Sequence, residues 1–347
     1  MRQRALALFL ALFLAGCTSP VRTRELEQLQ LVETLGFDGG LGDLTISVAP
    51  AADPEGEAPA PLSARGHSVT EAIDRLRAAS PREELFFAHV RFAAVGERAA
   101  RAGLAPLLDW FARSTQTPLN VPLFVVRGGP AEALVTTVPE NGREITARLE
   151  TLHRAEEARC ATLLEAARQL ARSGTALTAA VRSSAEGPVF AGSALWKDGA
   201  LAGFFDEDET QGAQLLRSRV PRRALSLPLG EVARFTVELK GARCRLAAAP
   251  EGLRVTARCR AGLVEAEGFG ALDESALAAI DAALAEALAG KIAAAIAASQ
   301  RMDADVLELC RRTGLDAADF PTLPWRVEVT AAVERSYDID GEGRLAP

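Results

Sequence analysis

Hydrophobic and polar residues alternate with two periodicities along this chain. A period of two predicts strands, and a period near 3.6 predicts helices. Leu44 to Val48 alternates with period two and follows the apolar run Leu26 to Leu35, with a glycine-rich turn at 38–43 between them. This arrangement predicts a hairpin of two strands. Residues 50–61 are rich in proline, alanine and acidic residues, which predicts a surface loop.

Helical periodicity dominates residues 66–172. Ser68 precedes a helical stripe of apolar residues, and Glu71 stands three positions after it, as in a capping box. A strand, a helix and a second strand follow in that order, which predicts a right-handed βαβ unit. The pattern places strands over 85–95 and 121–126, and helices over 97–113, 130–135 and 147–172.

The strand pattern returns after residue 176. Candidate strands cover 177–181, 192–196 and 201–205. The acidic run Asp206 to Glu209 then begins a helix that continues through Leu216, and its carboxylates suit the positive end of a helix dipole. A cation site on the same carboxylates is the functional alternative.

A long helix is the main prediction for residues 229–347. Apolar residues recur every three or four positions from Ser275 to Gln300, so we expect one buried stripe. A membrane-spanning interpretation of this helix is excluded, because Asp281, Glu286 and Lys291 interrupt the apolar run. The rest of this segment predicts strands over 232–239 and 253–264, a second helix over 303–312 and a closing strand over 325–333.

The predicted elements indicate a fold of the α+β or mixed α/β class, with antiparallel and mixed sheets packed by helices. A two-stranded hairpin is only marginally stable without a covering layer, so we infer that residues 25–63 pair with strands from 176–205. Residues 66–172 would then be inserted into that first domain. We therefore expect three domains, which are 25–63 plus 176–227, the inserted 66–172, and 229–347.

The first residues have the pattern of an exported protein. Arg2 and Arg4 precede an apolar run from Ala5 to Ala15, which is too short to span a membrane and is typical of a signal peptide. The end of this run, Leu14-Ala15-Gly16-Cys17, is similar to a bacterial lipobox. We expect removal of residues 1–16, lipid on Cys17 and a tether over 17–24. The alternative is a chance cysteine in an ordinary signal peptide.

The charge balance argues against a nucleic-acid partner. The chain has 39 Lys and Arg against 46 Asp and Glu, a formal net charge of −7. Loss of Arg2 and Arg4 with the signal peptide changes the balance to 37 − 46 = −9. A chain of this charge lacks the positive field that attracts phosphate backbones.

Four cysteines follow Cys17, and export permits them to form disulfides. Cys244 and Cys259 flank a probable turn at residues 250–252, so a cross-strand bridge is one interpretation. Their inferred register is offset by about two residues, and two separate half-buried thiols are the other interpretation. The cysteines form no C-x-x-C pair and no cluster with histidine, which excludes a zinc site of that kind.

Chemical motifs are scarce. The three histidines, His67, His89 and His153, have no recognisable nucleophile partner, which a general base would require. Residues 191–195 lack the second glycine of a nucleophile elbow, and the glycines at 39–42 are too few for a dinucleotide loop. We therefore expect no enzyme, and no catalytic, cofactor or metal residues.

Short motifs over almost the whole chain resemble, in the same order, those of the Ger(x)C (GerAC-type) family of spore germination lipoproteins, the C subunits of nutrient germinant receptors. No single motif is strong, but their order makes the set specific. The motifs are the lipobox at Cys17, Arg24-Glu25-Leu26, Leu35-Gly36-Phe37-Asp38, Val69-Thr70-Glu71-Ala72-Ile73, His89-Val90, Val95-Gly96-Glu97, Leu107-Leu108-Asp109-Trp110-Phe111-Ala112-Arg113, Ala194-Leu195-Trp196-Lys197-Asp198-Gly199, Glu209-Thr210-Gln211-Gly212, Ala304-Asp305-Val306-Leu307 and Trp325-Arg326-Val327-Glu328-Val329.

The resemblance implies a three-domain protein without known catalytic residues, held by its lipid on the outer face of the spore inner membrane. It implies a complex with integral-membrane A and B subunits, which this chain helps to assemble or through which it transmits a nutrient signal. The chain departs from the family pattern at Phe37, where isoleucine is usual, after Ala304-Asp305, and at Ser336-Tyr337. These departures concern the contacts with partners more than the fold.

Two other functions stay open at this point. A substrate-binding lipoprotein of an importer usually has two lobes of repeated βα units, whereas the pattern contains one such unit. A surface hydrolase would need a nucleophile, a base and an orienting group together, and the sequence offers no recognisable trio.

Overall fold

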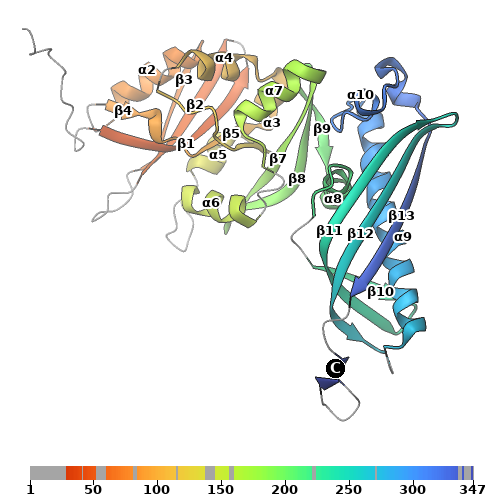
Figure 1. Ribbon diagram of the computed structural model, residues 1–347. Helices are drawn as coiled ribbons and strands as arrows, with labels where there is room; N and C mark the ends of the chain where they lie inside the picture. Colours follow the sequence, from red (N-terminus) through yellow and green to blue (C-terminus); the bar gives the residue numbers. More distant parts are fainter. Residues whose placement is uncertain are drawn as a thin grey trace, which may run out of the picture.

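A computed structural model describes residues 29–40, 42–51, 60–80, 84–114, 116–136, 145–155, 160–220, 224–269, 272–334, 338–339 and 345–346. Within these ranges the protein is a mixed α+β fold with two large sheets, each covered by helices (Figure 1). The expected fold class is confirmed. The signal peptide, Cys17 and most of the loop expected over 50–61 lie outside the described residues.

The first sheet combines parallel strands in its centre with hairpins on both sides. Among the described residues it contains β1 (Leu29–Gly40), β2 (Asp43–Pro50), β3 (Leu62–Gly66), β4 (Glu84–Phe86), β5 (Phe92–Gly96), β6 (Leu123–Val126), β7 (Thr175–Ser184), β8 (Gly187–Lys197) and β9 (Ala200–Phe205). Their order is β3-β2-β1-β5-β6-β7-β8-β9, with β4 beside β1. Strands β1, β5, β6 and β7 are parallel, and the β1–β2 hairpin is present as predicted.

The expected pairing between residues 25–63 and 176–205 is wrong. Strands β5 and β6 lie between β1 and β7 and pair with both of them. Residues 66–172 therefore supply the middle of one continuous sheet and are not an inserted domain with a sheet of its own. The βαβ connection is the physical reason, because a crossover helix brings the next parallel strand back beside the first one.

Helices cover both faces of the first sheet. One face is covered by α2 (Val69–Ala79), α3 (Glu97–Ala102), α4 (Ala105–Arg113) and α7 (Leu163–Ser173), and the other by α5 (Ala131–Thr136) and α6 (Ile145–Ala155). Side chains of β6 alternate between the two faces. Leu123 and Val125 belong to the first core, and Phe124 and Val126 belong to the second.

Helix α2 forms as its sequence predicts. The Ser68 hydroxyl accepts a hydrogen bond from the Glu71 N–H, and the predicted stripe is buried. The Glu71 carboxylate accepts from the N–H of His67, one residue before the cap, so the second half of the expected capping box is shifted. The buried residues of the stripe are Val69, Ala72, Ile73 and Leu76.

The strand expected over 85–95 is divided in two. Its first part, β4, pairs with Leu29–Leu31 of β1, and its second part, β5, pairs with Thr34–Phe37. Between Phe86 and Phe92 the chain advances six positions while β1 advances three, from Leu31 to Thr34. The excess is accommodated in a short 3₁₀ helix at Phe87–His89, which places His89 outside any strand.

Two expected helices are also divided. The helix over 97–113 stops at Gly103, whose φ of 115° is incompatible with helix, and resumes as α4. The helix over 147–172 becomes α6 and α7 because Thr162 is extended and begins a new helix with a full capping box to Glu165. Apolar spacing alone did not indicate either break.

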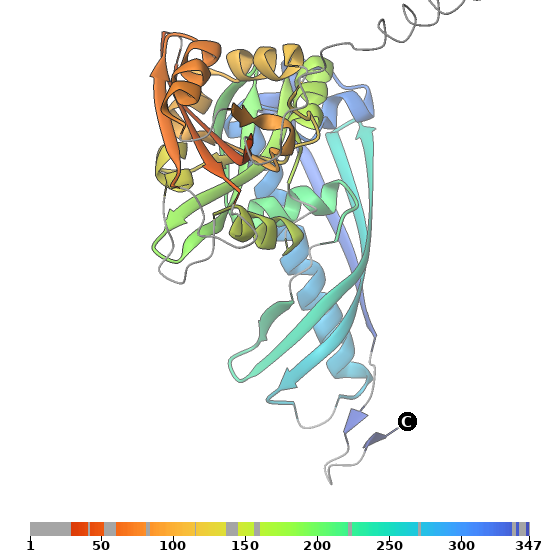
Figure 2. The same cartoon turned by 90° about the vertical axis from the view of Figure 1, so that its left-hand side faces the viewer.

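The second sheet is elongated and packs against one long helix, as Figure 2 shows. Within the described ranges it contains β10 (Leu225–Leu229), β11 (Ala233–Ala249), β12 (Gly252–Glu267) and β13 (Trp325–Glu334). Strands β10, β11 and β12 are antiparallel, and β13 runs parallel to β12. Helix α9 (Glu274–Arg301) covers the sheet with the predicted stripe, of which Ile280, Leu284, Leu288, Ile292 and Ile296 are fully buried.

Helix α8 (Glu207–Leu216) lies between the two sheets. Every residue from Thr210 to Leu216 is buried, because one side packs on the first sheet and the other on α9. The helix expected over 303–312 is reduced to α10 (Leu309–Thr313), since Asp303 and Glu308 both have positive φ. The described residues also form a 3₁₀ helix at Ala317–Thr322 and a two-stranded pair, β14 (Asp338–Ile339) with β15 (Leu345–Ala346).

No helix within the described ranges combines the length and the apolar content that crossing a membrane requires.

Candidate functional site

The three histidines do not form a site. The structure places His67 before α2, His89 in the 3₁₀ helix and His153 on α6. The Nδ1 atom of His67 lies 2.8 Å from the carbonyl oxygen of Gly42, and the ring of His153 packs edge-on against Phe92. These contacts give His67 and His153 a local structural role.

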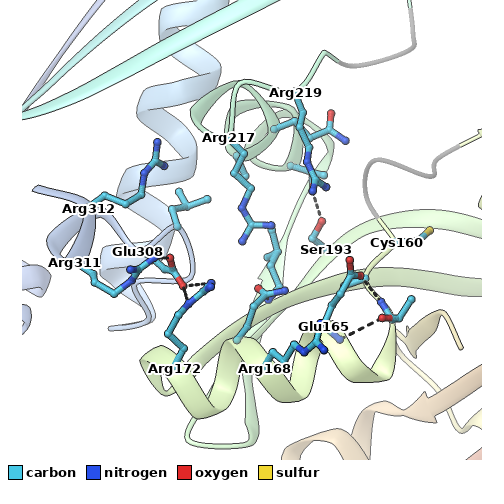
Figure 3. Close-up of a pocket in the computed structure, with 18 of the residues that line it drawn as sticks. Cys160, Glu165, Arg168, Arg172, Ser193, Arg217, Arg219, Glu308, Arg311 and Arg312 are labelled. Atoms are coloured by element: carbon cyan, nitrogen blue, oxygen red, sulfur yellow. Dashed lines mark hydrogen bonds and ion pairs between the residues drawn. The ribbon is translucent and has the colours of Figure 1, made fainter. Parts of the chain in front are cut away.

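A cleft of about 1050 Å³ lies where helix α7 of the first sheet faces the end of α8 and the segment around α10. Helix α7, the end of α8 and the segment before and within α10 form its walls (Figure 3). Arginines dominate its charged lining, and two carboxylates, Glu165 and Glu308, accompany them. The arginines are Arg168, Arg172, Arg217, Arg219, Arg311 and Arg312.

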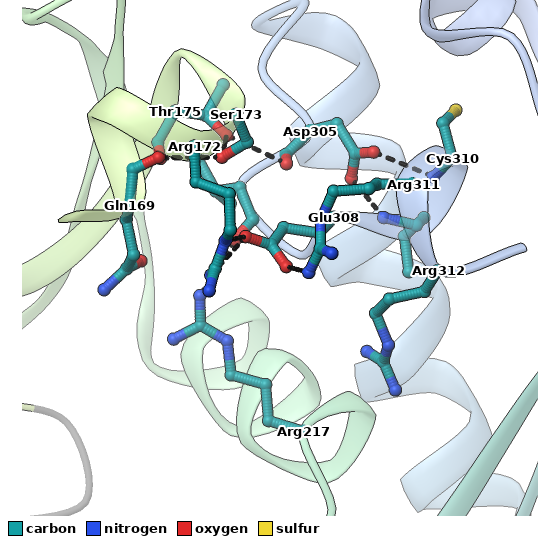
Figure 4. A network of polar contacts seen from close by, with 12 residues as sticks. Gln169, Arg172, Ser173, Thr175, Arg217, Asp305, Glu308, Cys310, Arg311 and Arg312 are labelled. Atoms are coloured by element: carbon teal, nitrogen blue, oxygen red, sulfur yellow. Dashed lines mark hydrogen bonds and ion pairs between the residues drawn. The ribbon is translucent and has the colours of Figure 1, made fainter. Parts of the chain in front are cut away.

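Glu308 organises one side of the cleft. Its Oε1 accepts a hydrogen bond from Nε of Arg172 at 2.7 Å, and its Oε2 pairs with Arg311, as Figure 4 shows. Burial alone would raise the pKa of Glu308, but the hydrogen bonds from Arg311 and Arg172 hold it below its usual value. Glu308 is therefore a charged link between α7 and α10.

Asp305 supports the same link. Its carboxylate accepts hydrogen bonds from the N–H groups of Leu309 and Cys310 at 2.7 and 2.9 Å, and so begins α10. Its backbone carbonyl accepts from the Thr175 hydroxyl on β7 at 3.0 Å. Burial raises the pKa of Asp305, although the two backbone hydrogen bonds act in the opposite direction.

Arg217 lies deepest among the cleft arginines. Burial, together with the positive charges of Arg219, Arg312 and Arg172, lowers the pKa of its guanidinium to about 10, against the effect of Glu308. Its Nη2 donates to the carbonyl oxygen of Val306 at 2.8 Å. Arg217 is therefore a half-buried cation at neutral pH, and its hydrogen-bond partner Val306 is a neutral carbonyl group.

The acidic run at the start of α8 is used within the protein. Asp206 and Glu209 form a full capping box, and Glu209 also pairs with Arg301 at 3.1 Å. Asp208 pairs with Lys291 on α9. Among the described residues, no group of three or more His, Cys, Asp and Glu side chains could hold a metal ion. The structure thus gives these carboxylates a capping and docking role.

Comparisons with known proteins agree with this arrangement. The family model of the spore germination protein N-terminal domain matches residues 22–182, and the model described as spore germination B3/GerAC like, C-terminal, matches residues 191–336. The chain belongs to the GerAC family of spore germination proteins. This confirms the family that the sequence motifs indicated, and it is a family of receptor subunits, not of enzymes.

A solved structure has a similar fold. The crystal structure of the GerBC protein matches with a TM-score of 0.53 and 13% sequence identity, over 86% of this chain and 96% of that chain. At this identity the match shows the fold alone. A search of curated proteins gave no match.

The GerAC-like motif Glu209-Thr210-Gln211-Gly212 has a structural explanation. Glu209 closes the capping box, and the buried Thr210 hydroxyl donates to Ser193 on β8 at 3.2 Å. A Cβ atom at Gly212 would lie 2.0 Å from the carbonyl oxygen of Lys291 on α9. The motif therefore fixes α8 to the first sheet and to helix α9, and glycine is needed where α8 and α9 touch.

Two further GerAC-like motifs meet at the carboxyl ends of the parallel strands. Asp38, at the end of β1, accepts hydrogen bonds from the N–H groups of Ala131 and Glu132 at 2.8 and 2.6 Å and so begins α5. A Cβ atom at Gly96, at the end of β5, would lie 1.9 Å from Oδ1 of Asp38. This edge is a common ligand position in α/β sheets, but here it is used for internal capping.

Cys244 and Cys259 are free thiols in the structure, so the expected alternative of a bridge between them is not formed. Cys244 lies opposite Ala257, and Cys259 lies opposite Ala242, which is the two-residue offset inferred from the sequence. Diagonal neighbours in a sheet are about 7–8 Å apart, beyond the usual Cα separation in a disulfide. Burial raises the pKa of Cys259 to about 11.

The arginine cleft was missed from the sequence. Its residues come from α7, from the end of α8 and from the segment around α10, which are far apart in the chain. The segment after α8 has four arginines in seven residues, 217–223, but no sequence pattern connects it with α7 or α10. The arginine doublet Arg311-Arg312 and the pair Arg217 and Arg219 were the available signals, and only the tertiary fold brings them together.

Proposed function

We propose that this GerAC-family protein is a lipid-anchored C subunit of a nutrient germinant receptor and that it works with integral-membrane A and B subunits. The observation that carries the proposal is the succession of two germination-family matches over residues 22–182 and 191–336. The lipobox ending in Cys17 supports the anchor. Acyl chains on Cys17 would hold the folded part beside its membrane partners and raise its effective concentration there.

The protein's own chemistry supports a role in assembly or signal transmission. The charged residues described above are used to cap helices and to join the two sheets, and the histidines are dispersed. A protein that transmits a signal through contacts needs rigid, connected units. Helix α8, and Glu308 with its partners Arg172 and Arg311, supply such a connection between the sheets.

Substitution of Cys17 tests the proposal. In spores of the source organism, Cys17→Ala should move the protein from the membrane fraction to soluble or misprocessed fractions and reduce nutrient-triggered germination. Cys310→Ala, which changes a buried internal thiol, is the matched control and should stay in the membrane fraction. An unchanged membrane fraction for Cys17→Ala would refute the anchor. A gene deletion that leaves every nutrient response intact would refute the receptor role.

A further inference from the structure

The cleft between the two sheets has more positive charge than its own carboxylates balance. Its six arginines face two glutamates, and both glutamates are engaged. Glu165 accepts the N–H of Thr162 in the capping box, and Glu308 pairs with Arg172 and Arg311. Arg168, Arg217 and Arg312 have no ion pair with a carboxylate of the described residues.

Arg217 makes this imbalance costly. This half-buried cation loses part of its hydration, and one hydrogen bond to a carbonyl oxygen compensates that loss only in part. Figure 4 shows the end of its side chain next to Arg172 of α7, and the positive charges of Arg219, Arg312 and Arg172 all act against its own charge. Arg312 is itself directed by a hydrogen bond from Nη1 to the carbonyl oxygen of Leu216 at 3.2 Å. The arginines therefore line one cleft from three segments, and hydrogen bonds to backbone carbonyl oxygens direct Arg217 and Arg312.

Polar groups on the floor of the cleft add a second and independent observation. Gln214 is 5% exposed and lines the cleft, and its Oε1 is buried with no hydrogen-bond partner among the described residues. Ser193, also buried, accepts the Thr210 hydroxyl and keeps its own proton to donate. A ligand here can thus meet guanidinium donors, a hydroxyl donor and one amide acceptor.

We propose that this cleft binds a phosphate group, with its oxygens held by Arg217, Arg312 and Arg168 and a phosphate O–H donating to Gln214 Oε1. Guanidinium groups match phosphate oxygens with two hydrogen bonds each and bind them more strongly than neutral donors do. A cleft of about 1050 Å³ is larger than phosphate alone, so the group belongs to a larger molecule, either a soluble phosphate monoester or the monoester headgroup of phosphatidic acid. Binding would join α7, α8 and α10 and stiffen the connection between the sheets.

Titration of the purified full chain in detergent with inorganic phosphate and glycerol 3-phosphate tests the site. We expect a saturable rise in Tm for the wild type and at least about a tenfold weaker affinity for Arg217→Gln. Arg168→Gln, at the exposed rim of α7, should also weaken binding and carries little risk to folding. Arg258→Gln, on the exposed face of β12, is the matched control and should bind as the wild type does.

The remaining arms separate phosphate from general anion attraction and identify its source. Succinate at equal ionic strength should give no saturable shift, and an equal shift with succinate would overturn the proposal. Equal phosphate affinity in the wild type, Arg217→Gln and Arg168→Gln would overturn it too. Binding to vesicles with phosphatidic acid is compared with binding to glycerol 3-phosphate, in the wild type and in Arg217→Gln. The molecule that carries the bound phosphate group is the one whose binding is lost in Arg217→Gln. Absence of binding to all of these probes would refute the site.

Discussion

The Nε atom of Arg172 lies 2.7 Å from Oε1 of Glu308, and this hydrogen bond joins helix α7 of the first sheet to the segment before α10. The Glu308 side chain is 13% exposed, whereas that of Arg172 is 53% exposed. The carboxylate is therefore the more buried partner of the pair, and it also pairs with Arg311. Loss of the carboxylate would leave two cations next to Arg217 without their shared counter-charge.

Glu308→Gln should lower the free energy of unfolding by about 1–2 kcal/mol, because it removes the charge from a largely buried acceptor of two arginines. Chemical denaturation at low salt measures the loss. Glu334→Gln removes an exposed partner of Lys240 and is the control, with an expected change below about 0.5 kcal/mol. An equal loss in the two variants would contradict a special role for Glu308.

The same pair gives a pH dependence. The pKa of Glu308 is lower in the folded protein than in the unfolded chain, so its contribution is complete above the unfolded value of about 4.3. That contribution disappears as the pH falls through the lower folded pKa. The stability difference between wild type and Glu308→Gln should therefore narrow on acidification below pH 4.3. A difference that widens there would contradict the assignment.

Gly212→Ala should destabilise the protein by about 2–3 kcal/mol, because its Cβ would lie 2.0 Å from the backbone oxygen of Lys291 and neither helix can yield freely. Gly290→Ala, on α9, is the matched control. No atom lies within 4 Å of the Cβ position there, so alanine should stabilise the helix by about 0.5–1 kcal/mol. Thermal unfolding of both variants measures the contrast, and a loss of stability at Gly290 would contradict it.

Asp38→Ala should cost about 1–3 kcal/mol, because it leaves the N–H groups of Ala131 and Glu132 without their acceptor. Burial raises the pKa of Asp38, so the folded state holds its proton more tightly than the unfolded chain does. The stability contribution of Asp38 should therefore grow as the pH falls through the raised folded pKa.

Urea denaturation at neutral and acidic pH tests this prediction, and Asp43→Ala is its control, since Asp43 is an exposed partner of Arg98 at the other end of the turn. The gap between wild type and Asp38→Ala should widen on acidification. A constant or narrowing gap would show that the burial of Asp38 does not govern its proton affinity.

Cys259 should react slowly with thiol reagents in the folded protein, because it is 3% exposed and burial raises its pKa to about 11. Alkylation followed by mass spectrometry, before and after denaturation, measures the protection. After denaturation without reductant, both Cys244 and Cys259 should become alkylated. A mass two hydrogens too low, with both sites unmodified, would show a bridge that the structure does not contain.

Local sequence rules predicted those elements whose cause is local. The cap at Ser68, the stripe of α2, the start of α8 at its acidic run and the buried face of α9 follow from residues within one or two turns of each other. The break at Gly103 was missed because apolar spacing continues across it. The positive φ angles of Asp303 and Glu308, which interrupt the helix expected over 303–312, were missed for the same reason. The residue types at these positions do not by themselves indicate a left-handed conformation.

The sheet order and the cleft depend on distant residues. The pairing of β1 with β5 and of β6 with β7 is decided by how the crossover helices pack, which a single strand pattern does not contain. Motif residues such as Asp38 and Gly212 could be recognised without their role, because their partners are 93 and 79 positions away, at Ala131 and Lys291. No local sequence rule and no family motif predicted that the arginines of the cleft lie together.

The hairpin of β7 and β8 has a consequence for how this protein can be divided. The first family match ends at residue 182 and the second begins at residue 191, so their boundary falls inside this hairpin. Yet the indole N–H of Trp196 on β8 donates to the buried hydroxyl of Thr178 on β7, and the two strands share a core. A fragment ending at the boundary would present an unpaired β7 edge, which invites aggregation. The hairpin thus joins the two matched segments, and a cut at the boundary between the family models would separate two strands that share one core.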